Sequence, residues 1–359
     1  MQLPSCGQKL GRHKPPAFGD HRRWLWLGLA VVVVVLSAHS AGAADRIVLR
    51  ASTGSGTITL PCQIVDWTGR EITVRLRSSS EPKKYPAEQV IAVETSKGRR
   101  HALGEELYRQ GRVADAQRAF EEALRQEPRV WVRRQILAML VRCAVWQGDY
   151  VAAGERFLAL VRSDPMTQYF GTIPLAWNGP SSASAALRSR ARVWLGNSSD
   201  TARLLGASFL LTEVEAQTQA HEVLKELARS RDDRVRSLAR AQQWRARLQS
   251  GDVGRLELAH WEEDIERMPQ GIRGGPYFVL GLGHELRREF DLAATAYLWV
   301  PLVYDENPRL AAHALLRAAE CLAKMGNSSA AERLQREVIA RFPKTKFAET
   351  AASRLKLTP

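Results

Sequence analysis

The chain has 359 residues, a formal net charge of +14, 45% hydrophobic residues and 25% charged residues. This composition is that of an ordinary globular protein rather than a disordered one, and the length allows two or three domains with their own cores. Residues 1–43 hold five Lys and Arg against one Asp, a net of +4, which leaves +10 on the remainder. A basic protein favours acidic peptides, anionic lipid or nucleic acid as partners. No nucleic-acid-binding motif accompanies the charge, so nucleic acid is not expected.

The first 43 residues have the parts of an export signal. Arg22 and Arg23 precede the apolar run Trp24–Leu36, and Ala41-Gly42-Ala43 supplies a small-x-small cleavage site. The apolar run is shorter than the roughly 20 residues of a membrane span. We therefore expect a signal peptide and a periplasmic or otherwise exported mature chain. The alternative is an uncleaved anchor in the inner membrane that retains residues 24–38, and membrane contact is expected only in that case.

Residues 44–96 alternate apolar with polar side chains, which is the period of β-strands. The alternating runs are 46–50, 56–60, 64–67, 71–76 and 90–94, with turn-forming glycines at 54–56 and 68–69. Short strands at this spacing predict a small β-barrel of the SH3-like or Sm-like kind, and the sequence does not distinguish the two. Trp67 and Tyr85 are candidate ligand-binding aromatics, but a unit this small favours both as part of its core.

Two helical hairpins are predicted over residues 97–165. Leu103 and Leu107 are four residues apart and fall on one face of the first helix. Gly104 allows the second helix to approach closely, and Gly111 supplies the turn. The second helix carries Ala116, Phe120 and Ala123 before Pro128 ends it. The same order recurs about 37 residues later, at Leu140, Ala144, Gly148, Tyr150, Ala153, Phe157, Leu160 and Pro165.

This pattern resembles the tetratricopeptide repeat, in which a large apolar residue and Gly are followed by Ala-x-x-x-Phe and a closing Pro. The resemblance implies helix pairs that stack into an α-solenoid and bind other proteins on the concave face. Residues 276–359 contain two similar hairpins and the entry helix of a further unit, carried by Leu280-Gly281, Phe290, Ala293, Tyr297, Leu322, Gly326, Ala331, Leu334, Val338 and Phe342-Pro343. This ending is similar to the repeats of periplasmic outer-membrane assembly lipoproteins and cell-division coordinators of Gram-negative bacteria.

The signature fades over residues 166–275. Residues 166–180 predict a loop rich in aromatics, which we expect to pack over the end of a helical stack rather than to bind a ligand. Apolar stripes then predict helices around 202–210, 220–228, 232–244 and 257–268, with Ser199 or Asp200 as a helix N-cap. These helices are either HEAT-type or tetratricopeptide-type. The whole chain is therefore predicted to be mainly α, a tetratricopeptide- or HEAT-like α-solenoid preceded by the small barrel.

No motif for catalysis is present. The eight histidines are scattered, no two lie at i and i+4, and neither a phosphate-binding loop nor a Gly-x-Ser-x-Gly elbow occurs. The four cysteines have no metal-ligand spacing, and buried free thiols are their simplest interpretation. We therefore expect a protein that is not an enzyme and holds no cofactor and no metal.

The resemblance places candidate ligand-binding residues on the first helix of each hairpin, because these helices line the concave face of such arrays. The matching positions are His101, Glu105, Tyr108, Arg109, Arg142 and Trp146. The two arginines could bind a carboxylate of a peptide through charge-assisted hydrogen bonds. The two aromatics offer the contact area enriched at binding hot spots. The alternative, equally weighted, is that all six are solvated surface positions.

The sequence thus predicts a non-catalytic scaffold in the periplasm or cell envelope that binds a protein or peptide partner. Its rivals are an adaptor anchored in the membrane and an accessory module that binds a cell-wall component through residues 44–96. The identity of the partner is not encoded in any motif.

Overall fold

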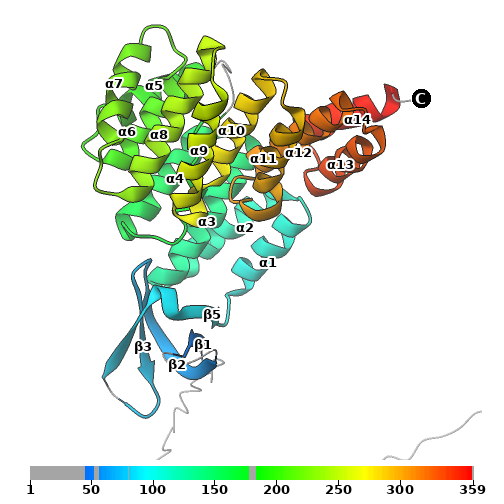
Figure 1. Cartoon of the computed structure of the whole chain (residues 1–359). Coiled ribbons are helices and arrows are strands. Elements are labelled where there is room, and N and C mark those ends of the chain that lie inside the picture. The colour runs from blue at the N-terminus through cyan, green and yellow to red at the C-terminus, as the bar shows by residue number, and fades with distance from the viewer. Residues whose placement is uncertain (1–44, 52–55, 80, 178–182, 358–359) are drawn as a thin grey trace, which may run out of the picture. The chain divides into compact units, whose positions relative to one another are not determined.

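The computed structural model describes residues 45–51, 56–79, 81–177 and 183–357. The chain divides into two compact units, 1–41 and 42–359, and every described residue belongs to the second. The expected signal peptide and most of the expected turn at 54–56 lie outside the described residues. Within the second unit, a five-stranded sheet precedes a series of helical hairpins (Figure 1). This confirms the mainly α fold with a small β unit before it.

The sheet is antiparallel, with strand order β4-β3-β2-β1-β5. Its strands are β1 (Asp45–Arg50), β2 (Thr57–Trp67), β3 (Glu71–Leu76), β4 (Pro82–Pro86) and β5 (Val90–Glu94). Two runs predicted as separate strands form the single strand β2, which continues through Pro61 and Cys62. The strand β4 was not predicted, because two of its five residues are proline. Such a segment is tolerated at the edge of a sheet, where β4 pairs only with β3.

One face of the sheet is buried against the helices rather than inside a closed barrel. Ile47, Ile72 and Val74 are fully buried, and they share one core with Phe120 and Trp131 of the first hairpins. No pairing joins β4 to β5 among the described residues. The sheet is therefore open at its ends, and the repeats supply the cover that a closed barrel would supply to itself.

The helical part begins at Arg99 and continues to Leu357. Its helices are α1 (Arg99–Arg109), α2 (Val113–Gln126), α3 (Val130–Gln147), α4 (Tyr150–Ser163), α5 (Ala185–Leu195), α6 (Asp200–Leu210), α7 (Gln217–Leu227), α8 (Asp233–Arg247), α9 (Arg255–Arg267), α10 (Gly274–Leu286), α11 (Phe290–Val303), α12 (Pro308–Lys324), α13 (Ser328–Arg341) and α14 (Lys346–Leu357). Most consecutive helices pack against each other as antiparallel pairs, whereas α8 and α9 both pack against α10 (Figure 1). The predicted hairpins are α1–α2, α3–α4, α10–α11 and α12–α13, and α14 is the predicted entry helix.

The predicted role of the hairpin glycines is confirmed. A Cβ built on Gly104 would lie 2.7 Å from the ring of Phe120, and one built on Gly281 would lie 2.6 Å from the ring of Tyr297. Each glycine therefore lets an aromatic of the second helix rest on the backbone of the first. The turns also follow the prediction, since Gly111 has a positive φ of 69°, as do its counterparts in two other hairpins.

The hairpin pattern predicted that Leu103 is buried together with Leu107, and this was wrong for Leu103. Its side chain is 40% exposed, whereas Leu107 is buried and Leu140, the counterpart of Leu103 in the next hairpin, is 1% exposed. Leu140 packs back onto the preceding hairpin and shares its core with Phe120. Within the described residues, the sheet rather than a hairpin precedes α1, so the position of Leu103 has no preceding hairpin to pack against.

The middle of the chain continues the stack. The helices α6 to α9 were predicted, whereas α5 was missed because its Arg-rich sequence hides the apolar stripe of Leu187, Ala191 and Trp194. The segment before α5 contains the short 3₁₀ turn η2 (Phe170–Thr172), and Leu175 and Trp177 after it are almost fully buried. This segment packs within the helical core, whereas the sequence had suggested packing over the end of a helical stack. A Cβ on Gly275 would lie 2.0 Å from the ring of Trp177, so α10 fits directly over that ring.

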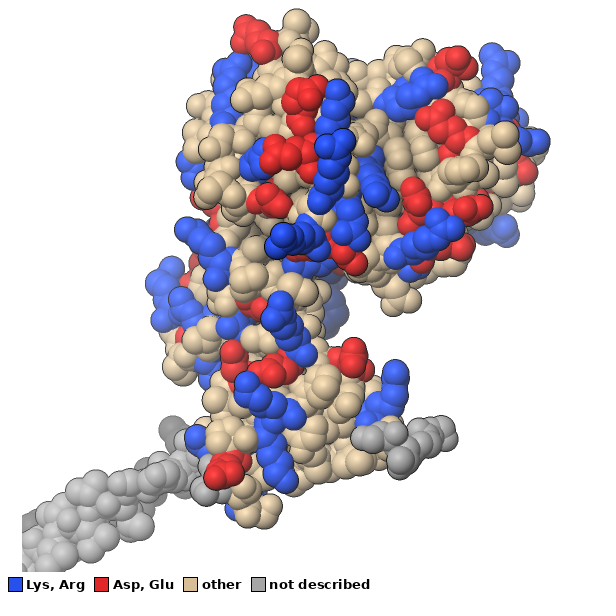
Figure 2. Space-filling model, turned by 60° about the vertical axis from the view of Figure 1, so that its left-hand side comes forward, with Lys and Arg blue, Asp and Glu red and all other residues tan. Residues whose placement is uncertain are grey.

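Lys and Arg side chains lie among Asp and Glu over the face drawn in Figure 2. Positive charge on this face is therefore not gathered into one continuous stripe. Elsewhere in the described part of the chain, ion pairs join helices to one another, such as Arg156 of α4 with Glu121 of α2 at 2.6 Å.

Candidate functional site

The largest cleft near the expected site lies between the sheet and the helical hairpins. It has a volume of about 720 Å³ and is lined by the ends of β2 and β5, by α1 and α3, and by the loops at η2, at Gly271 and at Glu306. We call it the sheet–helix cleft. Trp67, Met139 and Tyr169 contribute apolar surface to it, while Lys97 and Arg142 contribute positive charge.

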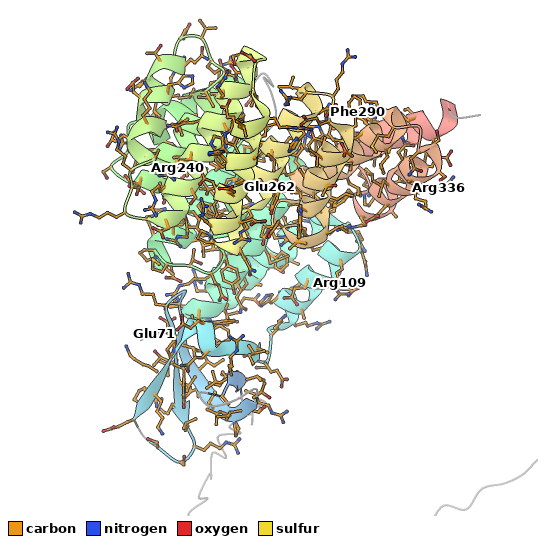
Figure 3. All side chains as sticks on the ribbon, in the orientation of Figure 1. Glu71, Arg109, Arg240, Glu262, Phe290 and Arg336 are labelled. Atoms are coloured by element: carbon orange, nitrogen blue, oxygen red, sulfur yellow. The ribbon has the colours of Figure 1, made fainter. Side chains whose placement is uncertain are left out.

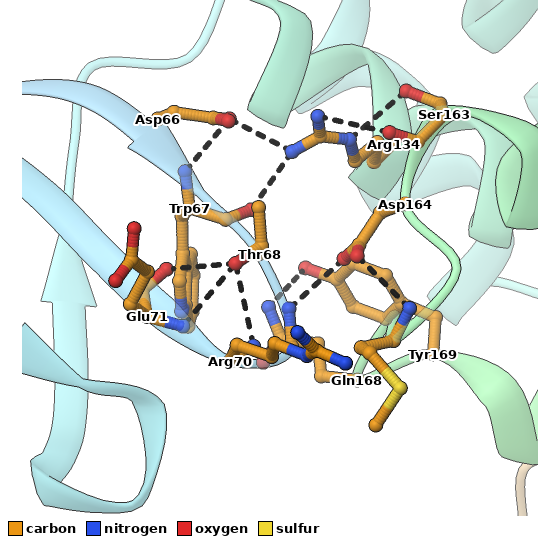
Figure 4. Close-up of polar contacts among 12 residues, drawn as sticks. Asp66, Trp67, Thr68, Arg70, Glu71, Arg134, Ser163, Asp164, Gln168 and Tyr169 are labelled. Carbon is orange, nitrogen blue, oxygen red and sulfur yellow. Dashed lines mark hydrogen bonds and ion pairs between the residues drawn. The ribbon is translucent and has the colours of Figure 1, made fainter. Parts of the chain in front are cut away.

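The sheet is fixed on the hairpins by a buried arginine (Figure 4). Arg134 of α3 is 6% exposed and donates to the carboxylate of Asp66 at 2.8 Å and to the carbonyl of Trp67 at 3.1 Å. The same guanidinium donates to the Ser163 hydroxyl at 2.9 Å and to the Ser163 carbonyl at 3.2 Å. One side chain therefore joins the end of β2 to α3 and the end of α4.

A second contact fixes the turn between β2 and β3. The backbone N–H of Gly69 donates to the buried carboxylate of Asp164 at 2.9 Å (Figure 4). A Cβ built on Gly69 would lie 1.6 Å from the carbonyl oxygen of Met166. Close by, the rings of Trp67 and Trp131 pack with centroids 6.2 Å apart. Trp67 is thus half-buried where the sheet meets α3, rather than enclosed within the sheet as expected, and Tyr85 is also half-buried.

Charges in the sheet–helix cleft are largely compensated. Glu105 accepts from Lys97 at 2.7 Å and lies 3.4 Å from the imidazole of His101. The hydrogen bond from His101, with a further contribution from Lys97, lowers the pKa of Glu105 to about 2 against the opposing effect of burial. On the opposite wall, burial raises the pKa of the Glu306 carboxyl. The cleft therefore combines an apolar floor with charges of both signs and is not a strongly basic groove.

The structure divides the six predicted site residues into two groups. His101, Glu105 and Arg142 line the sheet–helix cleft, whereas Tyr108, Trp146 and Arg109 do not. His101 is only 2% exposed and packs against the ring of Phe120, with centroids 6.1 Å apart, so it is chiefly part of the hairpin core. On α1, His101 shares the buried face with Gly104 and Leu107, and its predicted role in binding a ligand stays a prediction.

Tyr108 and Trp146 are covered by the end of the chain. Their rings pack edge to face at 5.6 Å, and Trp146 also packs against Phe342 at 6.0 Å. Arg309 donates to the carbonyl of Trp146 at 3.3 Å. These contacts link α3 to α12 and α13, so the C-terminal hairpins occupy the surface where an open solenoid would present both aromatics to a ligand.

The two arginines expected to share a carboxylate lie in different environments. Arg142 donates to the Asp305 carbonyl at 3.3 Å and to the Tyr108 hydroxyl at 3.4 Å. Arg109 lies at the exposed end of α1 and pairs with Glu106 (Figure 3). Arg142 is thus engaged at the wall of the cleft, and Arg109 lies outside it.

The prediction also missed residues that line the cleft. Met139 and Gln135 lie one and two helical turns before Arg142 on α3, so the 3.6-residue period could have identified both from Arg142 alone. Gln168 and Glu306 reach the cleft from loops, and no local pattern in the sequence identifies them.

The described residues give no sign of a catalytic site. No cluster of three metal-ligating side chains occurs among them. Burial raises the pKa of the described cysteine thiols, to about 11 for Cys62 and about 12 for Cys143 and Cys321, which disfavours the reactive thiolate.

Comparison with known proteins identifies the repeats. A family model described as tetratricopeptide repeat matches residues 107–172. A search of the curated proteins finds no relative. Among solved structures, the chain is similar to PilW, described as a widely conserved type IV pilus biogenesis factor, with 14% identity, 70% of this chain and 96% of that chain covered, and a TM-score of 0.31. At that TM-score the similarity carries no argument about function. The family match and the hairpin geometry together identify tetratricopeptide repeats within residues 107–172.

Proposed function

We propose that this protein is a non-catalytic scaffold and that the sheet–helix cleft is where a protein partner binds. The observation that carries the proposal is the joint construction of the cleft. Its walls come from the sheet, from two hairpins and from loops far apart in the sequence, and Arg134 and Asp164 tie these parts together. A binding surface assembled in this way loses little conformational entropy when a ligand binds.

The lining indicates what kind of segment would bind. Met139 and Tyr169 offer an apolar floor, and Gln135 and Gln168 supply amide groups that can donate and accept. The charged lining residues are Glu94, Glu105 and Glu306 against Lys97 and Arg142, a net of 2 − 3 = −1. This balance favours a partner segment with apolar and uncharged polar side chains, and an acidic partner is not favoured at this cleft.

The proposed location is the periplasm or cell envelope, and it rests on the export signal in residues 1–43. Of the helices in the described part of the chain, none combines the length and the hydropathy needed to cross a bilayer. N-terminal sequencing of the mature protein separates a cleaved signal from a retained anchor: a start near residue 44 supports export, and an intact N-terminus supports the anchored adaptor.

The cell-wall alternative assigns binding to the sheet. Because the sheet shares its core with Phe120 and Trp131, the test uses the full chain rather than residues 44–96 alone. The parent chain should then co-sediment with purified peptidoglycan. Loss of that co-sedimentation when Lys83 and Lys84 on the exposed strand β4 are changed to Glu would favour this alternative.

Site-specific photocrosslinking in the native host tests the proposed site. A photoreactive amino acid is placed at Met139 or Gln168 in the cleft, at Arg109 on the surface predicted from sequence, and at Arg336 on α13 as a control, which Figure 3 also labels. We expect the two cleft positions to give the same crosslinked partner and Arg336 to give none. Crosslinks from Arg109 without any from the cleft would reject the cleft and restore the sequence-based site.

A further inference from the structure

A second cleft lies at the ends of α8, α10 and α12, and it shares no lining residue with the sheet–helix cleft. Its volume is about 670 Å³. Leu248, Leu282, Leu286 and Phe290 give it an apolar floor, and Figure 3 labels Phe290 at the start of α11. Leu286 is 53% exposed, so part of this apolar floor is accessible to a ligand. We call this the α10 cleft.

The α10 cleft has an excess of positive charge. Its charged lining residues are Arg245, Arg288, Arg317 and Lys324 against the single carboxylate of Glu285, a net of 4 − 1 = +3. Glu285 accepts from Arg317 at 2.6 Å, from Lys324 at 2.9 Å and from the hydroxyl of Tyr297 at 3.0 Å. Glu285 therefore serves Arg317 and Lys324, and it leaves Arg245 and Arg288 without a counter-charge in the lining of the cleft.

Arg245 is a buried cation with only neutral partners. It is 4% exposed, and one terminal nitrogen donates to the carbonyls of Ala176 and Ser208 at 2.7 and 3.0 Å and to the amide oxygen of Gln242 at 2.7 Å. Its Nε has no hydrogen-bond partner among the described residues. Burial lowers the pKa of Arg245 to about 10, so the group is still charged at neutral pH. A buried charge without a counter-charge is costly, and a bound anion would offset part of that cost.

Arg288 provides an independent observation. In the other three hairpins of this type the turn residue with positive φ, two positions before the second helix, is glycine: Gly111, Gly148 and Gly326. At the equivalent position before α11 the residue is Arg288, with a φ of 61°. A side chain in this left-handed conformation carries a strain that glycine avoids. The strained residue is a cation at the rim of the α10 cleft, and no ion pair joins it to another described residue.

The arrangement of the charges indicates the ligand. The helix α10, which carries Leu282 and Leu286, packs between α8 and α12. Positive charge therefore flanks the apolar floor, with the buried Arg245 on α8 and the half-exposed Lys324 on α12, while Arg288 is exposed at the rim. Two separated positive groups around an apolar strip match a chain with carboxylates on both sides of a large apolar side chain. An amphiphile with one anionic head would leave one side unpaired.

We propose that the α10 cleft binds an acidic segment of a protein partner, in which a large apolar side chain lies between carboxylates. The proposal rests on the scaffold function but adds a second binding site with a different charge preference. The segment places its apolar side chain on Leu282, Leu286 and Phe290. One of its carboxylates meets Arg288 and another shares Lys324 with Glu285, while the buried Arg245 adds positive potential without direct contact.

The test uses the full chain and an array of ten-residue peptides in which the positions of Asp, Lys and large apolar residues are varied systematically. We expect binding to peptides with Asp on both sides of Leu, Phe or Trp, and at least tenfold weaker binding when Lys replaces Asp. Arg288→Gly is expected to weaken binding about three- to fivefold, as is Lys324→Gln. Because glycine removes the backbone strain, Arg288→Gly should also raise the Tm by about 2 °C.

Lys344→Gly is the matched control. Lys344 also has a φ of 61°, and it lines neither cleft. This change removes one positive charge and one strained side chain, so it should raise the Tm to a similar degree and leave peptide binding unchanged. Equal loss of binding in Lys344→Gly and Arg288→Gly would show that only net charge matters and would overturn the proposal.

Two other results would also overturn it. One is binding of the full chain to the arrayed peptides without any preference for those that combine Asp with a large apolar residue. The other is tight binding of oleate that excludes the peptides and is insensitive to Arg288→Gly, which would assign the cleft to a lipid. Photocrosslinking at Met139 should be unaffected by Arg288→Gly, so failure at the α10 cleft is distinguishable from failure of the scaffold function.

Discussion

Gly69→Ala is expected to detach the turn between β2 and β3 from the hairpins. The added Cβ would lie 1.6 Å from the carbonyl oxygen of Met166 and 2.5 Å from its carbonyl carbon. Both atoms belong to the backbone, so no side-chain rotation relieves the clash. The turn must move, and the hydrogen bond of 2.9 Å from Gly69 to Asp164 must lengthen or break.

The size of the effect follows from what is lost. Asp164 is 5% exposed, and a hydrogen bond to a charged acceptor contributes about 1.5–3 kcal/mol. Movement of the turn also strains the neighbouring bonds from Arg134 to Asp66 and Trp67. We therefore expect the free energy of unfolding to fall by about 2–3 kcal/mol, and the Tm by about 4–6 °C for a chain of this size.

Urea unfolding followed by tryptophan fluorescence measures this change, because Trp67 and Trp131 pack together beside the turn. Gly98→Ala is the matched control. A Cβ on Gly98 has no neighbour within 4 Å, and its φ of −57° suits alanine. The control should be neutral or stabilised by up to about 1 kcal/mol. If the free energies of unfolding of Gly69→Ala and Gly98→Ala differ by less than about 0.5 kcal/mol, the sheet does not dock on the hairpins through this turn.

Three further predictions concern the core. Gly104→Ala is expected to destabilise the first hairpin by about 1–3 kcal/mol, because its Cβ would lie 2.7 Å from a buried ring. A Tm equal to that of the parent chain would contradict this. In a Cys6→Ser chain, the remaining thiols should react with Ellman's reagent at pH 8 only after unfolding, because burial raises the pKa of each to 11 or above; rapid reaction of the native protein would show that they are accessible. Burial lowers the pKa of His313 to about 3, below its unfolded value of about 6.5. The unfolded state therefore binds more protons in this range, and stability should fall by up to about 2 kcal/mol from pH 7 to pH 5. His313→Leu should flatten that slope, and an unchanged slope would assign it to other groups.

Much of the helical part was predictable because its signals are local. The spacing of Gly104, Phe120 and Pro128 depends only on which residues share a helix face and where a helix must end. The pair Gly281 and Tyr297 repeats the same relation far along the chain, with the same close contact in the structure. The alternation of apolar residues also predicted most of the sheet, and it failed at β4, where proline conceals an edge strand.

The candidate site could not be predicted to the same degree. Helical matching selected Arg142, which lines the sheet–helix cleft, but it could not show that Phe342 and Arg309 return from the C-terminal hairpins to cover Trp146. Nor could it show that Leu103 would be exposed while its counterpart Leu140 is buried. That difference arises because the element described before α1 is the sheet rather than a hairpin.

The sequence by itself therefore determined the repeat unit, its turns and its small-on-large packing, because each is set by steric rules within about 35 residues. Only the tertiary structure decided where those units meet, which surfaces they cover, and that the sheet closes on the hairpins through Arg134. The physical reason is that these contacts join residues far apart in the chain. Their free energy depends on shape and burial that no local spacing records.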